Sequence, residues 1–564
     1  MAGGVKKPVN VFKLHNLDIP KEVFNWRLWF AVFSFSLLGA ARGVDEGLIS
    51  GAFNSKNFQK SIAYDSYSTV DQANIKANVS AMVQIGSVGG ALIAFLVCDR
   101  IGRIWATRQL CALWILGIAI FMGSKGNLSA IYAGRFIAGL GVGQTPVVGP
   151  VYIAEITPAA IRGLCTCLFT GFVYLGIVLA YFTNYGCQVN LGDTSAIRWL
   201  VPTSLHIIFS GLILILTLFQ SESPRYLVMK DQHEKALKTM ARLRHLPEDH
   251  EYVVTEISAI TAAHQRETEA TKDAGWLSTL KEAFLIPSNL YRVSLAITAQ
   301  IMSQWSGAGS ITLYAPDLFH LLGIADTNTN LLVTAVFGII KLVAAVICAL
   351  FLVDVIGRKR SLLLGITFQA IAMVYVAGFL TANPQLSAHK EKNVGALPAS
   401  QVGASKGAIA MIYISGFGWA LGWNSMQYLM TAELFPLRIR AFCTSLAMTF
   451  HFANQYGNSR AVPNMLLPTS SGGISPQGTF WFFAAVTLLG GVWVWFAMPE
   501  TAGRSLESMD RLFSLPWYKI GRYGNRVAEL EDAQVAASGE KSAELAHGEE
   551  VEVARGTGAG SEKV

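Results

Sequence analysis

The sequence predicts an all-α membrane protein with twelve transmembrane helices in two pseudo-symmetric halves of six helices each. Three observations support this fold class. The 564-residue chain is 52% hydrophobic and only 14% charged, whereas about a quarter of the residues of a soluble domain are charged. Twelve apolar runs reach the ~20 residues that cross the hydrocarbon core of a bilayer as a helix. Short charged motifs also recur in the same order in both halves.

The apolar runs give the order of the helices along the chain. They are predicted at residues 27–51, 79–98, 104–123, 129–153, 164–185, 199–219, 292–319, 331–353, 361–380, 407–432, 441–466 and 479–498. The predicted domains are a cytoplasmic N-terminal segment 1–26, a six-helix bundle 27–221, a cytoplasmic helical linker 222–288, a second bundle 289–498 and a cytoplasmic tail 499–564. The tail is acidic and poor in aromatic residues, so we expect disorder beyond about residue 520.

The distribution of Lys and Arg predicts the orientation in the membrane. The basic motifs "DRIGR" (99–103), "GRKR" (357–360) and "PLRIR" (436–440) alternate with loops 320–330 and 467–478, which contain no Lys or Arg. Cytoplasmic loops carry the excess of Lys and Arg, so both termini are predicted in the cytoplasm. The expected location is the plasma membrane. The net charge of +7 then reflects topology, and no basic cluster suggests a nucleic-acid partner.

Three pairs of motifs show that the chain is an internal duplication. "CDRIGRI" and "VDVIGRK" follow the second and eighth runs, "AEITPAAIRG" and "AELFPLRIRA" the fourth and tenth, and "SESPR" and "PETAGR" the sixth and twelfth. Parallel halves of this kind are one architecture of secondary transporters, in which the substrate binds near the middle of the membrane between the halves.

The repeated charges are candidates for a cytoplasmic gate. We expect ion pairs at the cytoplasmic helix ends to close that side in one state and to separate in the other. The set is Asp99, Arg103, Glu155, Arg162, Asp354, Arg358, Glu433 and Arg440. The plainer alternative is that these charges only set topology, but topology alone needs neither carboxylates nor a repeated spacing.

These motifs resemble those of the sugar porters of the major facilitator superfamily. The resemblance covers roughly residues 25–510 and includes "GVDEGLISG", "AGRFIAGLGVG", "PVYIAEITPAAIRG", "SESPRYL" and "PETAGRSLE". Within the family, "QWSGAGSITLYAP" (304–316) and "HFANQYGNSRAVP" (451–463) look most like the fungal porters grouped with quinate permeases. The resemblance implies the major facilitator fold and transport by alternating access, with no cofactor or metal.

Charged residues inside the apolar runs are predicted to be functional, because such residues are costly in a membrane. Arg42 lies three and four positions before Asp45 and Glu46, so it can reach either acid along one helix. In proton-coupled sugar porters the acid at the position of Asp45 takes up the proton, and the arginine at the position of Arg135 is its partner. The resemblance therefore implies proton coupling through Asp45 and Arg135, and the adjacent Glu46 is included in the candidate set. A static cluster, in which two arginines balance two carboxylates, is the alternative.

The resemblance also implies a set of substrate positions. They are Arg42, Thr170, Ser303, Gln304, Gly309, Tyr314, Trp423, Asn424, His451 and Gln455. Several amide side chains that usually contact sugar hydroxyls are replaced here, for example at Thr170, Ser303 and Gly309, whereas Arg42 and His451 are gained. These departures put a hexose substrate in doubt.

Two substrate classes remain open. One is a hydroxylated carboxylate such as quinate or a sugar acid, with Arg42 or His451 pairing with its carboxylate; we favour this class. The other is a neutral sugar or polyol, taken up by symport or by facilitated diffusion, with Arg42 only balancing Asp45 and Glu46. A transporter-like nutrient sensor is a third reading. An enzyme is not expected, because the chain has no HExxH, GxSxG or Walker A pattern. The expected partners are the small solute, a proton and the lipid bilayer.

Overall fold

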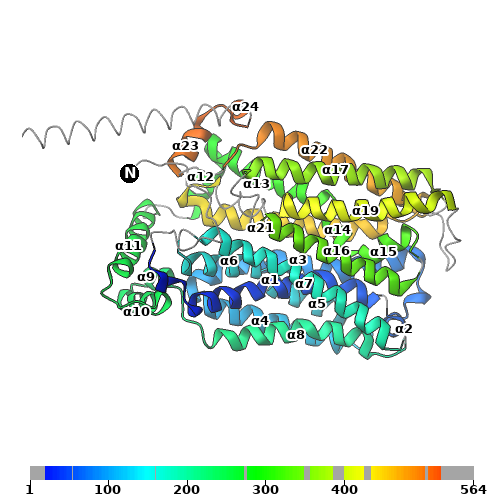
Figure 1. The fold of residues 1–564 in the computed structure, drawn as a ribbon, viewed down its shortest axis with the longest axis horizontal. Coiled ribbons are helices and arrows are strands. Elements are labelled where there is room, and N and C mark those ends of the chain that lie inside the picture. The colour runs from blue at the N-terminus through cyan, green and yellow to red at the C-terminus, as the bar shows by residue number, and fades with distance from the viewer. Residues whose placement is uncertain are drawn as a thin grey trace, which may run out of the picture.

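The computed structural model describes residues 19–53, 55–158, 161–192, 194–271, 276–324, 326–348, 356–384, 399–424, 434–501 and 506–521. Long helices run side by side in two groups, one formed by the N-terminal half of the chain and one by the C-terminal half (Figure 1). The first group contains α1 (Trp26–Phe53), α3 (Thr69–Ile101), α4 (Arg103–Met122), α5 (Leu128–Val142), α6 (Thr145–Ile156), α7 (Arg162–Asn190) and α8 (Ile197–Thr217). The second contains α13 (Pro287–Trp305), α14 (Ala308–Leu313), α15 (Ala315–Leu321), α16 (Thr327–Ile347), α17 (Arg358–Ala382), α19 (Ala399–Leu421), α21 (Leu437–Met465) and α22 (Ser475–Ala497).

Shorter helices mark the two ends of the bundle. The linker between the halves forms α9 (Pro224–Met229), α10 (His233–Arg244), α11 (Glu251–Thr271) and α12 (Trp276–Leu285). These helices gather at one end, together with α23 (Leu506–Ser514) and α24 (Trp517–Ile520), and we call it the linker end (Figure 1). The opposite end, with α2 (Lys56–Ser61) and α15, is the far end. The predicted disordered tail lies outside the described residues, apart from its first positions.

Nine helical segments of the described residues are long and apolar enough to cross a membrane. The seventh predicted run is instead divided into α13, α14 and α15. The backbone leaves helical geometry at Gly307, where φ is +88°, and again at Tyr314, where φ is −112°. A glycine accommodates this positive φ without steric cost. The run is therefore broken beside the motif that the sequence analysis associates with substrate.

The second helix is longer than its apolar run predicts. The run begins at residue 79, whereas α3 begins at Thr69 because the Ser68 hydroxyl caps its N-terminus by accepting a hydrogen bond from the Asp71 N–H at 3.2 Å. The added turns are polar and were not visible as part of a hydrophobic segment. They include Lys76, whose Nζ lies 2.7 Å from Asp317 Oδ2 on α15, so this extension connects the two halves at the far end.

The linker end of the N-terminal half contains a buried carboxylate at a helix start. Gly102 has φ +95° and ends α3 directly before α4 begins. The Glu222 carboxylate accepts hydrogen bonds from the backbone N–H groups of Arg103 at 3.0 Å and Ile104 at 3.2 Å. Burial raises the pKa of the Glu222 carboxyl group, and these N–H donors act in the opposite direction.

The C-terminal half repeats this arrangement. Gly357 has φ +97° and precedes α17, whose first N–H groups at Arg358 and Lys359 donate to Glu500 at 2.7 and 3.1 Å. An acidic group at a helix N-terminus satisfies N–H groups that have no partner within the helix. The paired motifs of the sequence thus form the same helix cap twice, which is the structural expression of the duplication.

Equivalent helix pairs also pack through glycine in both halves. A Cβ atom on Gly134 of α5 would lie 2.7 Å from the Gly117 carbonyl oxygen of α4. A Cβ atom on Gly418 of α19 would lie 2.6 Å from the Gly365 carbonyl oxygen of α17. Both contacts are too short for any side chain, so glycine permits the close backbone approach that is typical of membrane helices.

Candidate functional site

A buried ion pair lies inside the N-terminal half. Arg135 of α5 donates from Nη1 to Asp45 Oδ1 of α1 at 2.8 Å, and each residue is only 2% exposed. The Nε of Arg135 also donates to the Val79 carbonyl oxygen of α3 at 3.3 Å. These bonds hold the guanidinium between three helices. They offset much of the cost of burying the Asp45 carboxylate.

His206 of α8 is a third member of this group, and the sequence analysis missed it. Its Nε2 lies 3.2 Å from Asp45 Oδ1, and its Nδ1 lies 2.9 Å from the Thr203 carbonyl oxygen. The side chain is buried, with the Trp114 ring 6.3 Å from the imidazole. A single histidine in the sixth apolar run was the available signal, because a polar residue inside a membrane segment is functional by default.

The two ring nitrogens place His206 between the Thr203 carbonyl oxygen and the Asp45 carboxylate, and both of these groups accept hydrogen bonds. The nitrogen that carries the hydrogen depends on the tautomer of the ring. A proton taken up by Asp45 or by His206 would be held between two groups that are already in contact.

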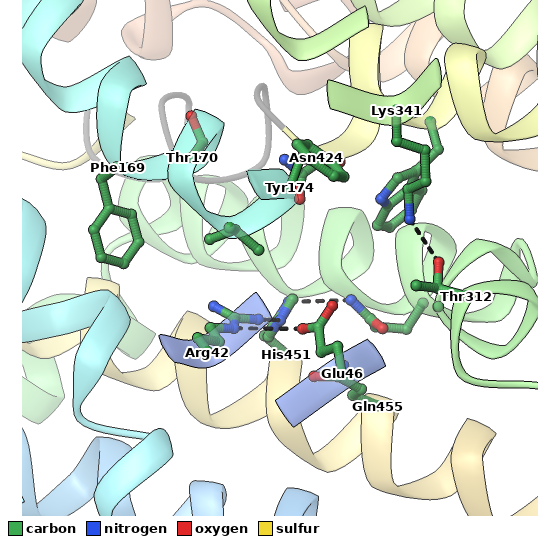
Figure 2. Close-up of a pocket in the computed structure, with 14 residues that line it drawn as sticks. Arg42, Glu46, Phe169, Thr170, Tyr174, Thr312, Lys341, Asn424, His451 and Gln455 are labelled. Carbon is green, nitrogen blue, oxygen red and sulfur yellow. Dashed lines mark hydrogen bonds and ion pairs between the residues drawn. The ribbon is translucent and has the colours of Figure 1, made fainter. Parts of the chain in front are cut away.

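A polar cavity lies between the halves. The space between its lining residues is about 520 Å³, including the part open to solvent. Helices α1 and α7 contribute from the N-terminal half, and α13, α14, α16, α19 and α21 from the C-terminal half. The lining residues are Arg42, Glu46, Phe169, Thr170, Val173, Tyr174, Gln304, Gly309, Thr312, Lys341, Trp419, Asn424, His451 and Gln455 (Figure 2).

Arg42 is held at the wall of this cavity by two neighbours. Its Nε lies 3.5 Å from Glu46 Oε1, one turn along α1, and its Nη2 lies 3.3 Å from His451 Nε2 on α21 (Figure 2). The guanidinium carbon also lies 5.4 Å from the centre of the Phe452 ring. Because α1 and α21 belong to different halves, the Arg42 and His451 contact crosses the interface between them.

The contacts of His451 determine its tautomer. An arginine can only donate, so His451 Nε2 accepts from Arg42 and the hydrogen resides on Nδ1. Nδ1 then donates to Gln300 Oε1 at 3.0 Å, whereas the Gln304 amide nitrogen, 3.1 Å away, cannot donate to it. The ring is therefore neutral in this arrangement, and it orients Arg42. Arg42 is therefore the cation at this part of the cavity wall.

The predicted substrate positions divide into two sets. Seven of them line the cavity: Arg42, Thr170, Gln304, Gly309, Asn424, His451 and Gln455. Three are buried behind it: Ser303, Tyr314 and Trp423. The Ser303 hydroxyl donates to the Gln300 carbonyl oxygen at 3.0 Å, and the Tyr314 hydroxyl donates to the Ser459 carbonyl oxygen at 2.9 Å. The structure therefore places these three in the supporting wall.

Lys341 also lines the cavity, and it is a second residue that the sequence analysis missed. It lies within the apolar stretch "FGIIKLVAAVI" of α16 and is 2% exposed. The charge balance drawn from the sequence, two arginines against two carboxylates, omits this lysine. Around Asp45 and the cavity, the described residues therefore include three cations, Arg42, Arg135 and Lys341, against the carboxylates of Asp45 and Glu46.

The predicted gate residues form ion pairs at the linker end of the N-terminal half. Arg103 contacts Glu155 of α6 through two bonds of 2.8 and 3.0 Å, and Asp99 at 3.0 Å. Arg162, seven residues after Glu155, is the first residue of α7. These ion pairs join helices of one half, and their separation in another state, as expected of a gate, stays a prediction.

The repeat of this set is only partly described. Arg440 of α21 donates to the Phe435 carbonyl oxygen at 3.0 and 2.9 Å, and Arg358 begins α17. Asp354 and Glu433 lie outside the described residues.

Comparison with known families decides the assignment. A family model described as "Sugar (and other) transporter" matches residues 31–513. The chain belongs to this family. A probable quinate permease of Aspergillus flavus is 30% identical over 520 residues, which cover 91% of this chain and 93% of the relative. The quinate permease of Emericella nidulans is 30% identical over 518 residues, with 91% and 94% covered. A probable quinate permease of Aspergillus niger is 31% identical over 499 residues, with 88% and 89% covered.

Solved structures of sugar transporters share the fold. The proton:xylose symporter XylE bound to 6-bromo-6-deoxy-D-glucose aligns with a TM-score of 0.70 at 22% identity, covering 86% of this chain and 99% of XylE. An inward-open conformation of XylE from E. coli aligns with a TM-score of 0.66 at 21% identity, with 86% and 99% covered. The predicted major facilitator fold is thereby confirmed. This sugar porter is a multi-pass membrane transporter and not an enzyme.

Proposed function

We propose that this transporter is a proton-coupled symporter that imports a small hydroxylated carboxylate, such as quinate or a sugar acid. The observation that carries the proposal is that Asp45 and Glu46 are consecutive on α1 but belong to different polar groups. Asp45 contacts Arg135 and His206, whereas Glu46 lines the cavity beside Arg42. A movement of α1 that changes the cavity therefore also changes the group that holds the proton.

Proton binding and substrate binding are coupled through α1 in this proposal. An ionised Asp45 attracts Arg135 more strongly than a neutral carboxyl group does. Uptake of a proton by the Asp45 and His206 pair weakens this attraction, so α1 moves more easily relative to α5. Arg42 lies less than one turn before Asp45 and contacts His451 of the other half, so the same movement remakes the cavity wall.

The chemistry of the cavity and the named relatives support a hydroxylated carboxylate. Arg42 presents planar N–H donors at the wall, a geometry that suits a carboxylate. Thr170, Gln304 and Asn424 add polar groups suited to hydroxyls. Gln455 Oε1 is buried and has no hydrogen-bond partner among the described residues, so it is available to a substrate hydroxyl. Relatives about 30% identical are named quinate permeases.

A neutral sugar or polyol is the second candidate substrate. The contact of 3.5 Å between Arg42 and Glu46 favours it, because this cation already has a counter-charge. The two candidates differ in whether the cavity needs an anion from the substrate.

Transport by the purified protein in liposomes tests the proposal. Labelled quinate, inositol and glucose are supplied outside, with and without a pH gradient that is acidic outside. We expect quinate to accumulate above its external concentration only with the gradient. If quinate only reaches the same concentration inside and outside, with or without the gradient, transport is by facilitated diffusion. Accumulation of inositol or glucose without quinate transport would favour the second candidate.

A further inference from the structure

Lys341 is a buried cation in the middle of a membrane-spanning helix. It belongs to α16 of the C-terminal half and lines the cavity, with 2% of its surface exposed. Figure 2 shows Lys341 and Arg42 entering the cavity from different helices, with the lysine side chain directed toward Thr312. A charged residue at this depth is costly, so its retention in an apolar helix indicates a function.

The neighbours of Lys341 hold its ammonium group without neutralising it. Nζ donates to Thr312 Oγ1 at 2.6 Å, and the Thr312 hydroxyl donates its own hydrogen to the Ala308 carbonyl oxygen at 2.9 Å. The rings of Tyr174 and Phe337 lie 5.2 and 5.3 Å from Nζ, at distances suited to cation–π contacts. No carboxylate of the described residues lies within ion-pair distance of Nζ.

The charges around the cavity do not balance in the absence of a ligand. Among the described lining residues, Arg42 and Lys341 supply two positive charges, whereas Glu46 is the one carboxylate and contacts Arg42. His451 is neutral in its observed contacts. The cavity is therefore one positive charge in excess, and the excess resides at Lys341. A bound molecule with one negative charge would remove this imbalance.

We propose that Lys341 binds the carboxylate of the substrate and restricts the cavity to solutes with a single negative charge. This inference rests on the proposed function, because it names the residue that recognises the acidic group. Lys341 has three N–H donors and uses one of them for Thr312, so others are available to a carboxylate. Arg42 adds planar donors to the same carboxylate, and Thr170, Asn424 and Gln455 then contact the hydroxyl-bearing remainder of the substrate.

The test measures binding to the purified protein. Tryptophan fluorescence is titrated with three hydroxylated probes that differ in charge: quinate with one negative charge, inositol with none and glucarate with two. The wild type should bind quinate most tightly. The variant Lys341→Met removes the charge and retains much of the length, and it should weaken quinate binding about ten- to a hundredfold. Inositol binding should change less than threefold. Lys238→Met removes an exposed positive charge from α10 and is the matched control.

Thermal unfolding of the same variants separates recognition from a structural role. Replacing an unpaired buried charge with an apolar side chain is neutral or stabilising, so Lys341→Met should have the same Tm as the wild type or a higher one. Quinate should raise the Tm of the wild type and of Lys238→Met more than that of Lys341→Met.

Two results would overturn the inference. One is unchanged quinate binding by Lys341→Met; the other is an equal loss for quinate and inositol together with a lower Tm. If the wild type binds none of the carboxylates, the proposed function itself is contradicted. This result differs from both of the results that contradict the role of Lys341, so failure of the proposed function and failure of this inference are distinguishable.

Discussion

Replacing Asp45 with Asn should abolish proton-driven accumulation while leaving exchange of substrate intact. The asparagine side chain would keep an oxygen that accepts from Arg135, which now donates to Asp45 at 2.8 Å, and would fill the same volume. The asparagine side chain cannot be ionised, so position 45 no longer changes its charge when a proton binds. Removing one partner from a buried ion pair costs about 3–5 kcal/mol, and we expect the lower end because the acceptor remains.

The size of the effect follows from the stoichiometry. One proton with one monocarboxylate carries no net charge, so the pH gradient alone drives accumulation and the membrane potential does not. A pH unit corresponds to about 1.4 kcal/mol per proton, a tenfold concentration ratio. A gradient of about two units therefore supports up to about a hundredfold accumulation of quinate by the wild type. The Asp45→Asn variant should reach a ratio of about one under the same gradient.

The assay compares liposomes that contain the wild type, Asp45→Asn or Asp65→Asn. Asp65 is an exposed carboxylate at the far end, so its substitution controls for the loss of one charge. Accumulation is measured with the pH gradient, and counterflow is measured with unlabelled quinate inside and no gradient. Counterflow needs only the reorientation of the loaded carrier, so Asp45→Asn should retain it. If Asp45→Asn accumulates quinate as the wild type does, the coupling role of Asp45 is refuted. If the variant loses counterflow in addition to accumulation, Asp45 has a structural role.

Three further predictions concern the groups around this site. Arg42→Lys should weaken quinate binding about tenfold, because an ammonium group cannot contact both Glu46 and His451 while presenting a planar donor pair. Fluorescence titration measures the affinity, and an equal loss for inositol would contradict direct recognition of the carboxylate by Arg42. His206→Gln should lower the accumulation of quinate under the pH gradient, because Asp45 loses the imidazole that lies 3.2 Å from Oδ1. Unchanged accumulation would remove His206 from the proton-binding group. Asp317→Asn should raise, by up to about fivefold, the rate at which an impermeant reagent labels a cysteine introduced at Ser310, a buried residue of α14. The ion pair of Asp317 with Lys76 joins the halves and contributes at most about 1 kcal/mol. Equal rates in Asp317→Asn and Asp65→Asn would mean that this ion pair does not hold the far end closed.

Some features of the fold could be predicted because they depend on local composition or on repetition. The apolar runs predicted the long helices to within a few residues at most ends, since spanning a bilayer sets the length of an apolar helix. The paired motifs predicted the duplication, and the structure forms the same cap at Glu222 and Glu500. The polar start of α3 was missed, because its first turns include Lys76 and contain no apolar run.

The candidate site was predicted less completely. Asp45 and Arg135 could be paired from the resemblance, although they are 90 residues apart. His206 and Lys341 were not found, because each is a single polar residue in an apolar run and no spacing links it to Asp45 or Arg42. Ser303, Tyr314 and Trp423 occur in the right motifs, but they point behind the cavity.

The sequence by itself determined the long apolar helices, the duplication and the presence of costly charges inside the membrane. The tertiary structure alone decided which charges meet. The rotation of each helix about its axis selects the residues that face the cavity, and the packing of neighbouring helices sets that rotation. Asp45 and Glu46 show the consequence, because one residue step along α1 turns the side chain by about 100°. This turn directs one carboxylate to Arg135 and His206 and the other to the cavity, where Lys341 of a different half supplies the excess charge.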